Sequence, residues 1–209
     1  MGRLALKIGA FALGIVLAAG CASTGLVNVW SQPGFNTPMK HLLVISVSSE
    51  ERNRRIIEDA FVKSLTQRGL QASPSYNAFP TALPDTQQVR DYVLANGFDG
   101  VLVTAHLPNR SVTAETPGYT TVETRTVYNN WSGRYHDYLV HVQHEGTTVV
   151  QKVVPHRVDL WFSDGKGGQI VWTGETNSVD PSSTNDVSRE MVGAIVPELA
   201  KAGLIPGKR

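Results

Sequence analysis

The hydrophobic pattern changes its period in the middle of this chain of 209 residues. Residues 40–47 (KHLLVISV) and 98–107 (FDGVLVTAHL) predict buried strands. Between them lie two segments with helical periodicity, and a weak strand separates these two segments. This order is typical of a parallel sheet with right-handed crossovers. Residues 120–176 are rich in Thr, Val, Tyr and Trp without a helical period, which predicts antiparallel strands. The expected fold class is α+β (mixed α/β): a parallel β-α-β-α-β core extended by an antiparallel meander, with a C-terminal helix.

Short-range signals predict where the helices and strands end. Glycine followed by an apolar residue, typical of a left-handed helix end, occurs at Gly69, Gly97 and Gly203. N-terminal helix caps are expected at Ser48 with Glu51, at Asp85 with Gln88, and within residues 182–185. Turns between strands are expected at residues 129–133, 145–146 and 164–168, and residues 158–175 form the clearest hairpin.

The first 20 residues have the layout of a secretory signal peptide: a basic start, an apolar run and a small-residue end. The apolar run is shorter than the roughly 20 residues that a membrane-spanning helix needs. The tetrapeptide AAGC ending at Cys21 resembles the lipobox of bacterial lipoproteins. This resemblance implies that Cys21 becomes the N-terminus and is diacylated on its sulfur, with palmitate as the expected acyl group. The alternative is a secreted protein cut by the general signal peptidase, with Cys21 as a free thiol.

Cys21 is the single cysteine of the chain. An envelope protein uses cysteines in pairs for disulfides, so one cysteine favours the lipid-attachment role. The residue after it is Ala22 rather than the aspartate that retains enteric lipoproteins at the inner membrane, so the resemblance implies the outer membrane, facing the periplasm. The expected organisation is a signal peptide (residues 1–20), a lipidated tether (21–38) and a single α/β envelope domain (39–209).

A second resemblance covers roughly residues 120–206. A Tyr-rich segment is followed by a strand-turn-strand unit that ends in V-W-x-G, here VWTG at residues 171–174. The pair resembles an uncharacterised (domain-of-unknown-function) family of bacterial envelope lipoproteins. The α/β order is more loosely similar to curli-secretion lipoproteins, peptidoglycan-synthase activator lipoproteins and the N-terminal domain of TolB. These resemblances imply envelope assembly or scaffolding by protein contact, not catalysis.

Several functional classes are disfavoured by the residues. The chain has 19 basic and 18 acidic residues, so it lacks the excess of positive charge that would attract nucleic acid. The chain contains no G-x-S-x-G, H-E-x-x-H or Walker-type motif, so we expect no enzyme, no catalytic residue and no cofactor. The richest polar cluster comprises His136, Asp137, His141 and His144. On a strand His141 and His144 point to opposite faces, so we expect no metal site.

Three aromatic residues are candidates for binding a partner protein: Trp131, Tyr135 and Tyr138. Exposed Tyr and Trp give contact area at low entropic cost, although the same residues could instead cover an edge of the core. The expected function is a binding or scaffolding module held to the membrane through the lipid on Cys21, with an envelope protein as partner. One alternative is a subunit of a secretion or transport assembly, in which residues 138–154 form a hairpin that pairs with neighbours or inserts in lipid. A second alternative is a secreted hydrolase-like enzyme.

Overall fold

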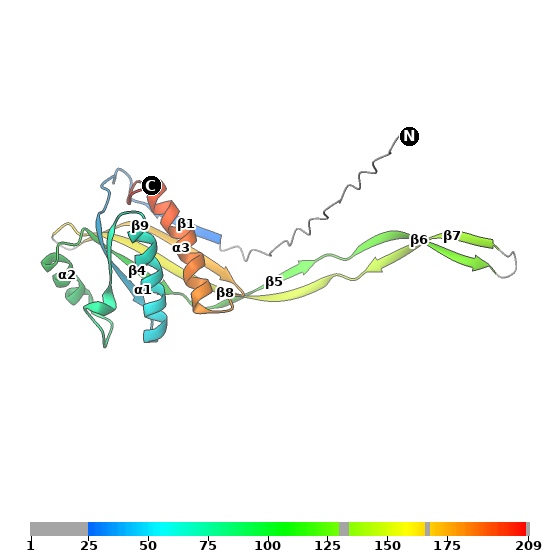
Figure 1. Ribbon diagram of the computed structural model, residues 1–209, viewed down its shortest axis with the longest axis horizontal. Helices are drawn as coiled ribbons and strands as arrows, with labels where there is room; N and C mark the ends of the chain where they lie inside the picture. The colour runs from blue at the N-terminus through cyan, green and yellow to red at the C-terminus, as the bar shows by residue number, and fades with distance from the viewer. Residues whose placement is uncertain (1–24, 130–133, 166–167, 208–209) are drawn as a thin grey trace, which may run out of the picture.

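A computed structural model describes residues 25–129, 134–165 and 168–207. Figure 1 shows a body of sheet and helices from which a long two-stranded arm projects. The elements in chain order are β1 (Gly25–Ser31), β2 (His41–Val47), α1 (Glu51–Thr66), β3 (Gln71–Pro74), the short 3₁₀ helix η1 (Ser75–Asn77), α2 (Thr86–Ala95), β4 (Gly100–His106), β5 (Arg110–Thr116), β6 (Tyr119–Asn129), β7 (Arg134–His144), β8 (Thr147–Phe162), β9 (Gln169–Val179) and α3 (Thr184–Lys201).

The main sheet has the strand order β1-β9-β8-β4-β2-β3. Strand β2 is parallel to both β3 and β4, as expected for two strand-helix-strand crossovers. The second half of the chain adds antiparallel pairs between β4 and β8, β8 and β9, and β9 and β1. The α+β fold class predicted from the sequence, with its parallel core and C-terminal helix, is therefore confirmed.

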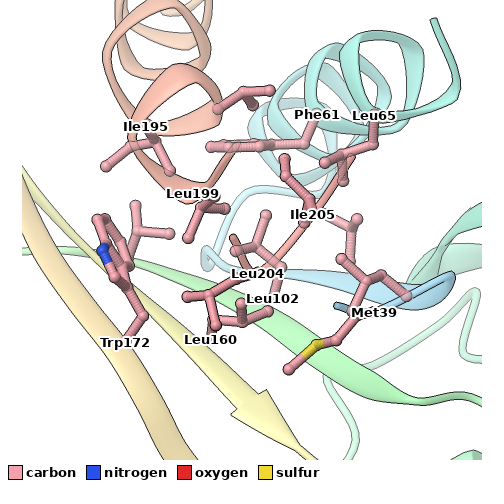
Figure 2. Packing of buried hydrophobic residues seen from close by; sticks show 14 of the residues in the cluster. Met39, Phe61, Leu65, Leu102, Leu160, Trp172, Ile195, Leu199, Leu204 and Ile205 are labelled. Atoms are coloured by element: carbon pink, nitrogen blue, oxygen red, sulfur yellow. The ribbon is translucent and has the colours of Figure 1, made fainter. Parts of the chain in front are cut away.

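The two faces of the sheet are covered unequally. Alternate residues of β2 belong to different clusters: Leu42 and Val44 pack with α1 and α3, whereas Leu43 and Ile45 pack with Val93 of α2. Figure 2 shows the larger core, in which side chains from α1 and α3 point toward those of β4, β8 and β9. The labelled core residues are Met39, Phe61, Leu65, Leu102, Leu160, Trp172, Ile195, Leu199, Leu204 and Ile205. The shorter α2 covers only part of the opposite face.

The V-W-x-G motif lies on β9, where its tryptophan enters the core. Trp172 is 1% exposed, and Gly174 follows on the same face because side chains alternate along a strand. A Cβ added at Gly174 would lie 2.5 Å from Cη2 of Trp172. The glycine of the motif therefore leaves room for the indole ring two residues before it.

All three predicted glycine exits are confirmed, and each closes its helix in the same way. Gly69, Gly97 and Gly203 have positive φ angles of 87°, 65° and 73°. The amide of the apolar residue that follows each glycine donates to a carbonyl in the last turn, as in a Schellman motif: Leu70 to Leu65 (3.2 Å), Phe98 to Val93 (3.1 Å) and Leu204 to Leu199 (3.0 Å).

The N-terminal caps agree with the sequence at two helices of three. Asp85 and Gln88 form a reciprocal capping box on α2, and Ser183 caps α3. The cap predicted at Ser48 for α1 is wrong, because the N-cap residue is Glu50 and makes no side-chain cap hydrogen bond. The hydroxyl of Ser48 instead accepts from the amide of Glu50 at 3.2 Å, so it stabilises the turn before the helix.

Part of the stretch expected to be a tether is a strand. Strand β1 pairs antiparallel with β9 from Gly25 opposite Asn177 to Ser31 opposite Trp172. Leu26 is partly buried against the larger core, and the ring of Phe35 meets that of Phe162 edge to face at 5.0 Å. The body therefore begins no later than residue 25, because long-range pairing with β9 orders a segment that has no clear period of its own.

A buried ion pair within α1 belongs to a hydrogen-bond network that reaches η1. Arg54 and Glu58 are both almost fully buried, and Nε of Arg54 donates to Oε1 of Glu58 at 3.0 Å. The same carboxylate oxygen accepts from the amide of Ser46 at 3.0 Å and from the hydroxyl of Ser75 at 2.7 Å. The network ties α1, the end of β2 and η1 together, as a buried charge must be paired to be tolerated.

Candidate functional site

The arm is the largest feature that the body does not need for its own core. Strands β5 and β6 lead outward and β7 and the first half of β8 lead back, so that residues 110–129 and 134–153 form one continuous hairpin (Figure 1). At about 3.3 Å per residue, each side of the arm reaches roughly 65 Å. Within the described residues, β6 and β7 pair only with each other. Each of these two strands of 11 residues therefore keeps one edge of unpaired backbone donors and acceptors, over about 36 Å.

The turn predicted at Glu145–Gly146 is wrong. Thr116 pairs with Thr147 and Tyr119 pairs with His144, so the chain continues from β7 into β8 without reversing. This position is a joint between the two halves of the arm. Gly146 faces Gly118 across the joint, and a Cβ at Gly146 would lie 2.7 Å from the carbonyl oxygen of Thr116. Only tertiary pairing with β5 and β6 distinguishes such a joint from a turn.

Two of the three predicted partner-binding residues lie on β7 of the arm. Tyr135 is 73% exposed and Tyr138 is 51% exposed, so neither covers the core. They are three positions apart and therefore lie on opposite faces of the ribbon. They do not form one aromatic patch. Trp131 lies outside the described residues, as does Cys21, the predicted lipidation site.

Both faces of the outer arm mix apolar and charged side chains. On the face of Tyr138, Arg125 and Glu123 approach each other at 3.9 Å. On the opposite face, Asp137 accepts a hydrogen bond of 2.6 Å from the hydroxyl of Thr126. The exposed apolar and aromatic residues along the arm are Val112, Tyr119, Val122, Val127, Tyr135, Tyr138, Leu139, Val149 and Val150. The arm is thus a two-sided ribbon and not a ribbon with one apolar face.

The histidines of the arm are spread over its two faces. His141 lies opposite Val122, and His144 lies opposite Tyr119 on the other face. The ring of His144 stacks on that of Tyr119 at 4.5 Å, and its Nε2 lies 3.1 Å from the hydroxyl of Thr121. Within the described ranges, no group of three or more His, Cys, Asp or Glu residues is arranged to hold a metal ion.

A polar cleft of about 520 Å³ lies at the root of the arm, where the N-termini of α1 and α3 approach β8. His156 lines it with an exposed fraction of 6%, and its Nδ1 has no hydrogen-bond partner among the described residues. Its ring lies 4.9 Å from that of His106. Burial, followed by the neighbouring charge of His106, lowers the pKa of His156 to about 4. Sequence reasoning missed this pair because only the register of β4 with β8 places the two histidines together.

No helix in the described part of the chain combines the length and hydrophobicity needed to cross a membrane.

Comparisons with known proteins give distant matches among solved structures. Neither a protein-family model nor a curated protein sequence matches the chain significantly. Among solved structures, a PelC dodecamer from Paraburkholderia phytofirmans is 11% identical with a TM-score of 0.47, over 88% of this chain and 99% of that one. The lipoprotein GNA1162 from Neisseria meningitidis is 13% identical with a TM-score of 0.37, over 78% of this chain and 99% of that one. Similarity at this level says nothing about function.

Proposed function

We propose that this protein is a lipoprotein of the outer membrane, facing the periplasm, that binds an envelope protein through its projecting arm. The observation that carries the proposal is the free two-stranded ribbon β6–β7. An isolated two-stranded hairpin is marginally stable in water, and a third strand or another packed element stabilises it. A partner that adds a strand to either edge would supply main-chain hydrogen bonds along the arm.

The charges of the arm favour protein contact over insertion in lipid. A lipid-facing strand needs an unbroken apolar face across the hydrocarbon. Here one face carries Glu123 and Arg125, and the other carries Asp137. A strand-pairing partner can accommodate such charges at the polar rim of an interface. We therefore rank pairing with a neighbouring protein above membrane insertion. The same ranking applies if the protein is instead a subunit of a secretion or transport assembly.

The proposed lipid anchor and the arm leave the body at the same end of the sheet. Gly25, four positions after Cys21, pairs with Asn177, which also pairs with Pro155. The arm starts two residues beyond, at Val153. Four residues span at most about 14 Å, so a lipid on Cys21 would hold the root of the arm near the membrane surface. Two or more acyl chains make such anchoring stable.

The anchor is tested by fractionating cells that make the Cys21→Ser protein. We expect the protein to leave the membrane fraction while its melting temperature stays unchanged, since Cys21 precedes every described element. Alanine at position 22 offers the matched control, because Ala22→Ser should leave the fractionation unchanged. If the Cys21→Ser protein remained with the membranes, the lipoprotein proposal would be wrong.

The arm is tested by photo-crosslinking in cells. A crosslinking amino acid replaces Tyr138 on β7 or, as a control, Lys63 on the exposed side of α1. We expect a reproducible envelope-protein adduct from position 138 and none from position 63. A second protein lacks residues 119–144, with the ends of β5 and β8 joined by a short turn. It should melt like the full chain but lose the partner in affinity purification. Capture that survives this deletion would refute the arm as the contact element.

A further inference from the structure

A second cavity lies between α2 and the less covered face of the sheet. Its volume is about 320 Å³, at the lower end of the range for small-molecule sites. Its walls come from three strands and one helix, and most of its lining is aliphatic or aromatic. The residues that define its interior are Ile45, Val89, Val93, Val101, Val103 and Trp161. The cavity is therefore suited to a hydrocarbon chain rather than to a polar molecule.

Arg90 is the cation at this cavity, and it forms no ion pair with any residue that the structure describes. Arg90 of α2 lines the cavity, and its Nε is buried with no hydrogen-bond partner among the described residues. The guanidinium of Arg54, which is almost fully buried, is by contrast engaged with Glu58, Ser75 and backbone carbonyls. A buried donor without a partner is costly. An anion that reached Arg90 would remove that cost and gain a charge-assisted hydrogen bond.

The acidic residue beside the cavity does not serve Arg90. Asp159 also lines it, but its carboxylate forms an ion pair with Arg157 at 2.9 Å. The hydroxyl of Thr173 donates to the same carboxylate. Asp159 therefore does not supply the missing partner of the Arg90 Nε, which stays open to a ligand within the described part of the chain.

The apolar surface continues outward from the cavity. Val47 and Leu94 line it while 47% and 46% exposed, respectively. Large apolar side chains exposed beside an apolar cavity are covered when a chain-like ligand extends over them. An arginine whose Nε has no partner among the described residues, together with an apolar cavity, matches a molecule with one negative end and one hydrocarbon chain.

From this geometry we propose that the cavity binds a single-chain amphiphile with a carboxylate head, such as a fatty acid. The hydrocarbon chain lies among Val89, Val101 and Val103, and the carboxylate meets the guanidinium of Arg90. This site is on the opposite face from α1 and α3, and it is separate from the arm. If the cavity were shown to bind no such ligand, the proposed function of the arm would be unaffected.

The test is calorimetric titration of the Cys21→Ser protein, in which no attached lipid competes, with decanoate and with 1-decanol. We expect saturable binding of decanoate at one molecule per chain. Arg90→Gln should weaken decanoate at least tenfold and leave 1-decanol within twofold, because the alcohol does not need the charge. The matched control Arg52→Gln removes an exposed arginine from α1 and should change neither affinity.

A filling variant checks the place of the hydrocarbon chain. Val103→Phe should weaken both ligands at least tenfold while retaining a cooperative melting transition. Arg90→Gln needs no such check of the core, since Arg90 is only partly buried on α2. The proposal is overturned if decanoate shows no saturable binding, if Arg90→Gln weakens 1-decanol as much as decanoate, or if a folded Val103→Phe protein binds both ligands normally.

Discussion

The indole of Trp172 occupies the space that a side chain at Gly174 would need, with Cη2 2.5 Å from the position of a Cβ there. Gly174→Ala should therefore destabilise the protein by about 1 to 3 kcal/mol, the usual cost of overpacking. Trp172→Ala alone should cost about 3 to 5 kcal/mol, as a large buried side chain is lost.

The two substitutions should not be additive. Once the indole is absent, an alanine methyl at position 174 has room, so its cost should fall to below about 0.5 kcal/mol in the Trp172→Ala protein. Urea unfolding of the four proteins of this cycle measures the coupling. Additive costs would show that the Trp172–Gly174 contact is not the reason for the motif.

Two arginine–glutamate pairs on α1 offer a matched comparison. Arg54 and Glu58 are buried, whereas Arg55 and Glu51 are exposed, and both pairs have the same spacing. Glu58→Gln leaves the guanidinium of Arg54 buried without a counter-ion and should cost about 3 kcal/mol of unfolding free energy. Glu51→Gln should cost less than about 0.5 kcal/mol. Equal losses in urea denaturation would contradict the network described for Glu58.

The stability of the fold should fall in mild acid because of His156. Its pKa is lowered to about 4 in the folded state, whereas an unfolded histidine titrates near 6.5. The unfolded state therefore takes up the proton first, so the stability is complete above about pH 6.5 and declines as the pH falls toward 4. At pH 5 the loss should be on the order of 2 kcal/mol.

The contribution of His156 is isolated by comparing unfolding free energies at pH 7.5 and pH 5. The His156→Leu protein should lack this part of the loss, whatever its stability at pH 7.5. His141→Gln, at an exposed position of the arm, should lose as much as the unsubstituted protein. If His156→Leu showed the full acid loss, another group would be responsible.

The glycine joint of the arm should be intolerant of a side chain. Gly146→Ala places a Cβ 2.9 Å from the amide nitrogen of Gly118, so the two strands must separate locally. We expect faster amide hydrogen exchange at the joint and in β6 and β7, with no change in the protection of α1 and α3. Gly193→Ala is the control: it is a helical site with open space, and it should stabilise α3 by about 0.5 to 1 kcal/mol. Unchanged exchange in the arm of Gly146→Ala would contradict the close approach.

The helix ends were predictable because caps act within a few residues. The exits at Gly69, Gly97 and Gly203 and the capping box at Asp85 depend on backbone angles and hydrogen bonds that close within one turn. The N-cap of α1 was misplaced because the turn at Ser48 competes for the same hydroxyl. The hydrophobic patterns that mark strands and helices also lie within short stretches of the chain, so the fold class could be predicted from their order.

The sequence by itself determined the alternation of strands and helices and the hairpin of β8 and β9, whereas the exposure of the aromatic residues around Tyr138 came from the structure. Only the tertiary structure decided that β1 joins the sheet, that Gly146 is a joint rather than a turn, and that His106 meets His156. It also decided that Arg90 lines an apolar cavity, where its Nε has no partner among the described residues. The physical reason is that these features depend on register between strands far apart in the chain, and the free energy of such pairing comes from contacts that no short window of residues contains.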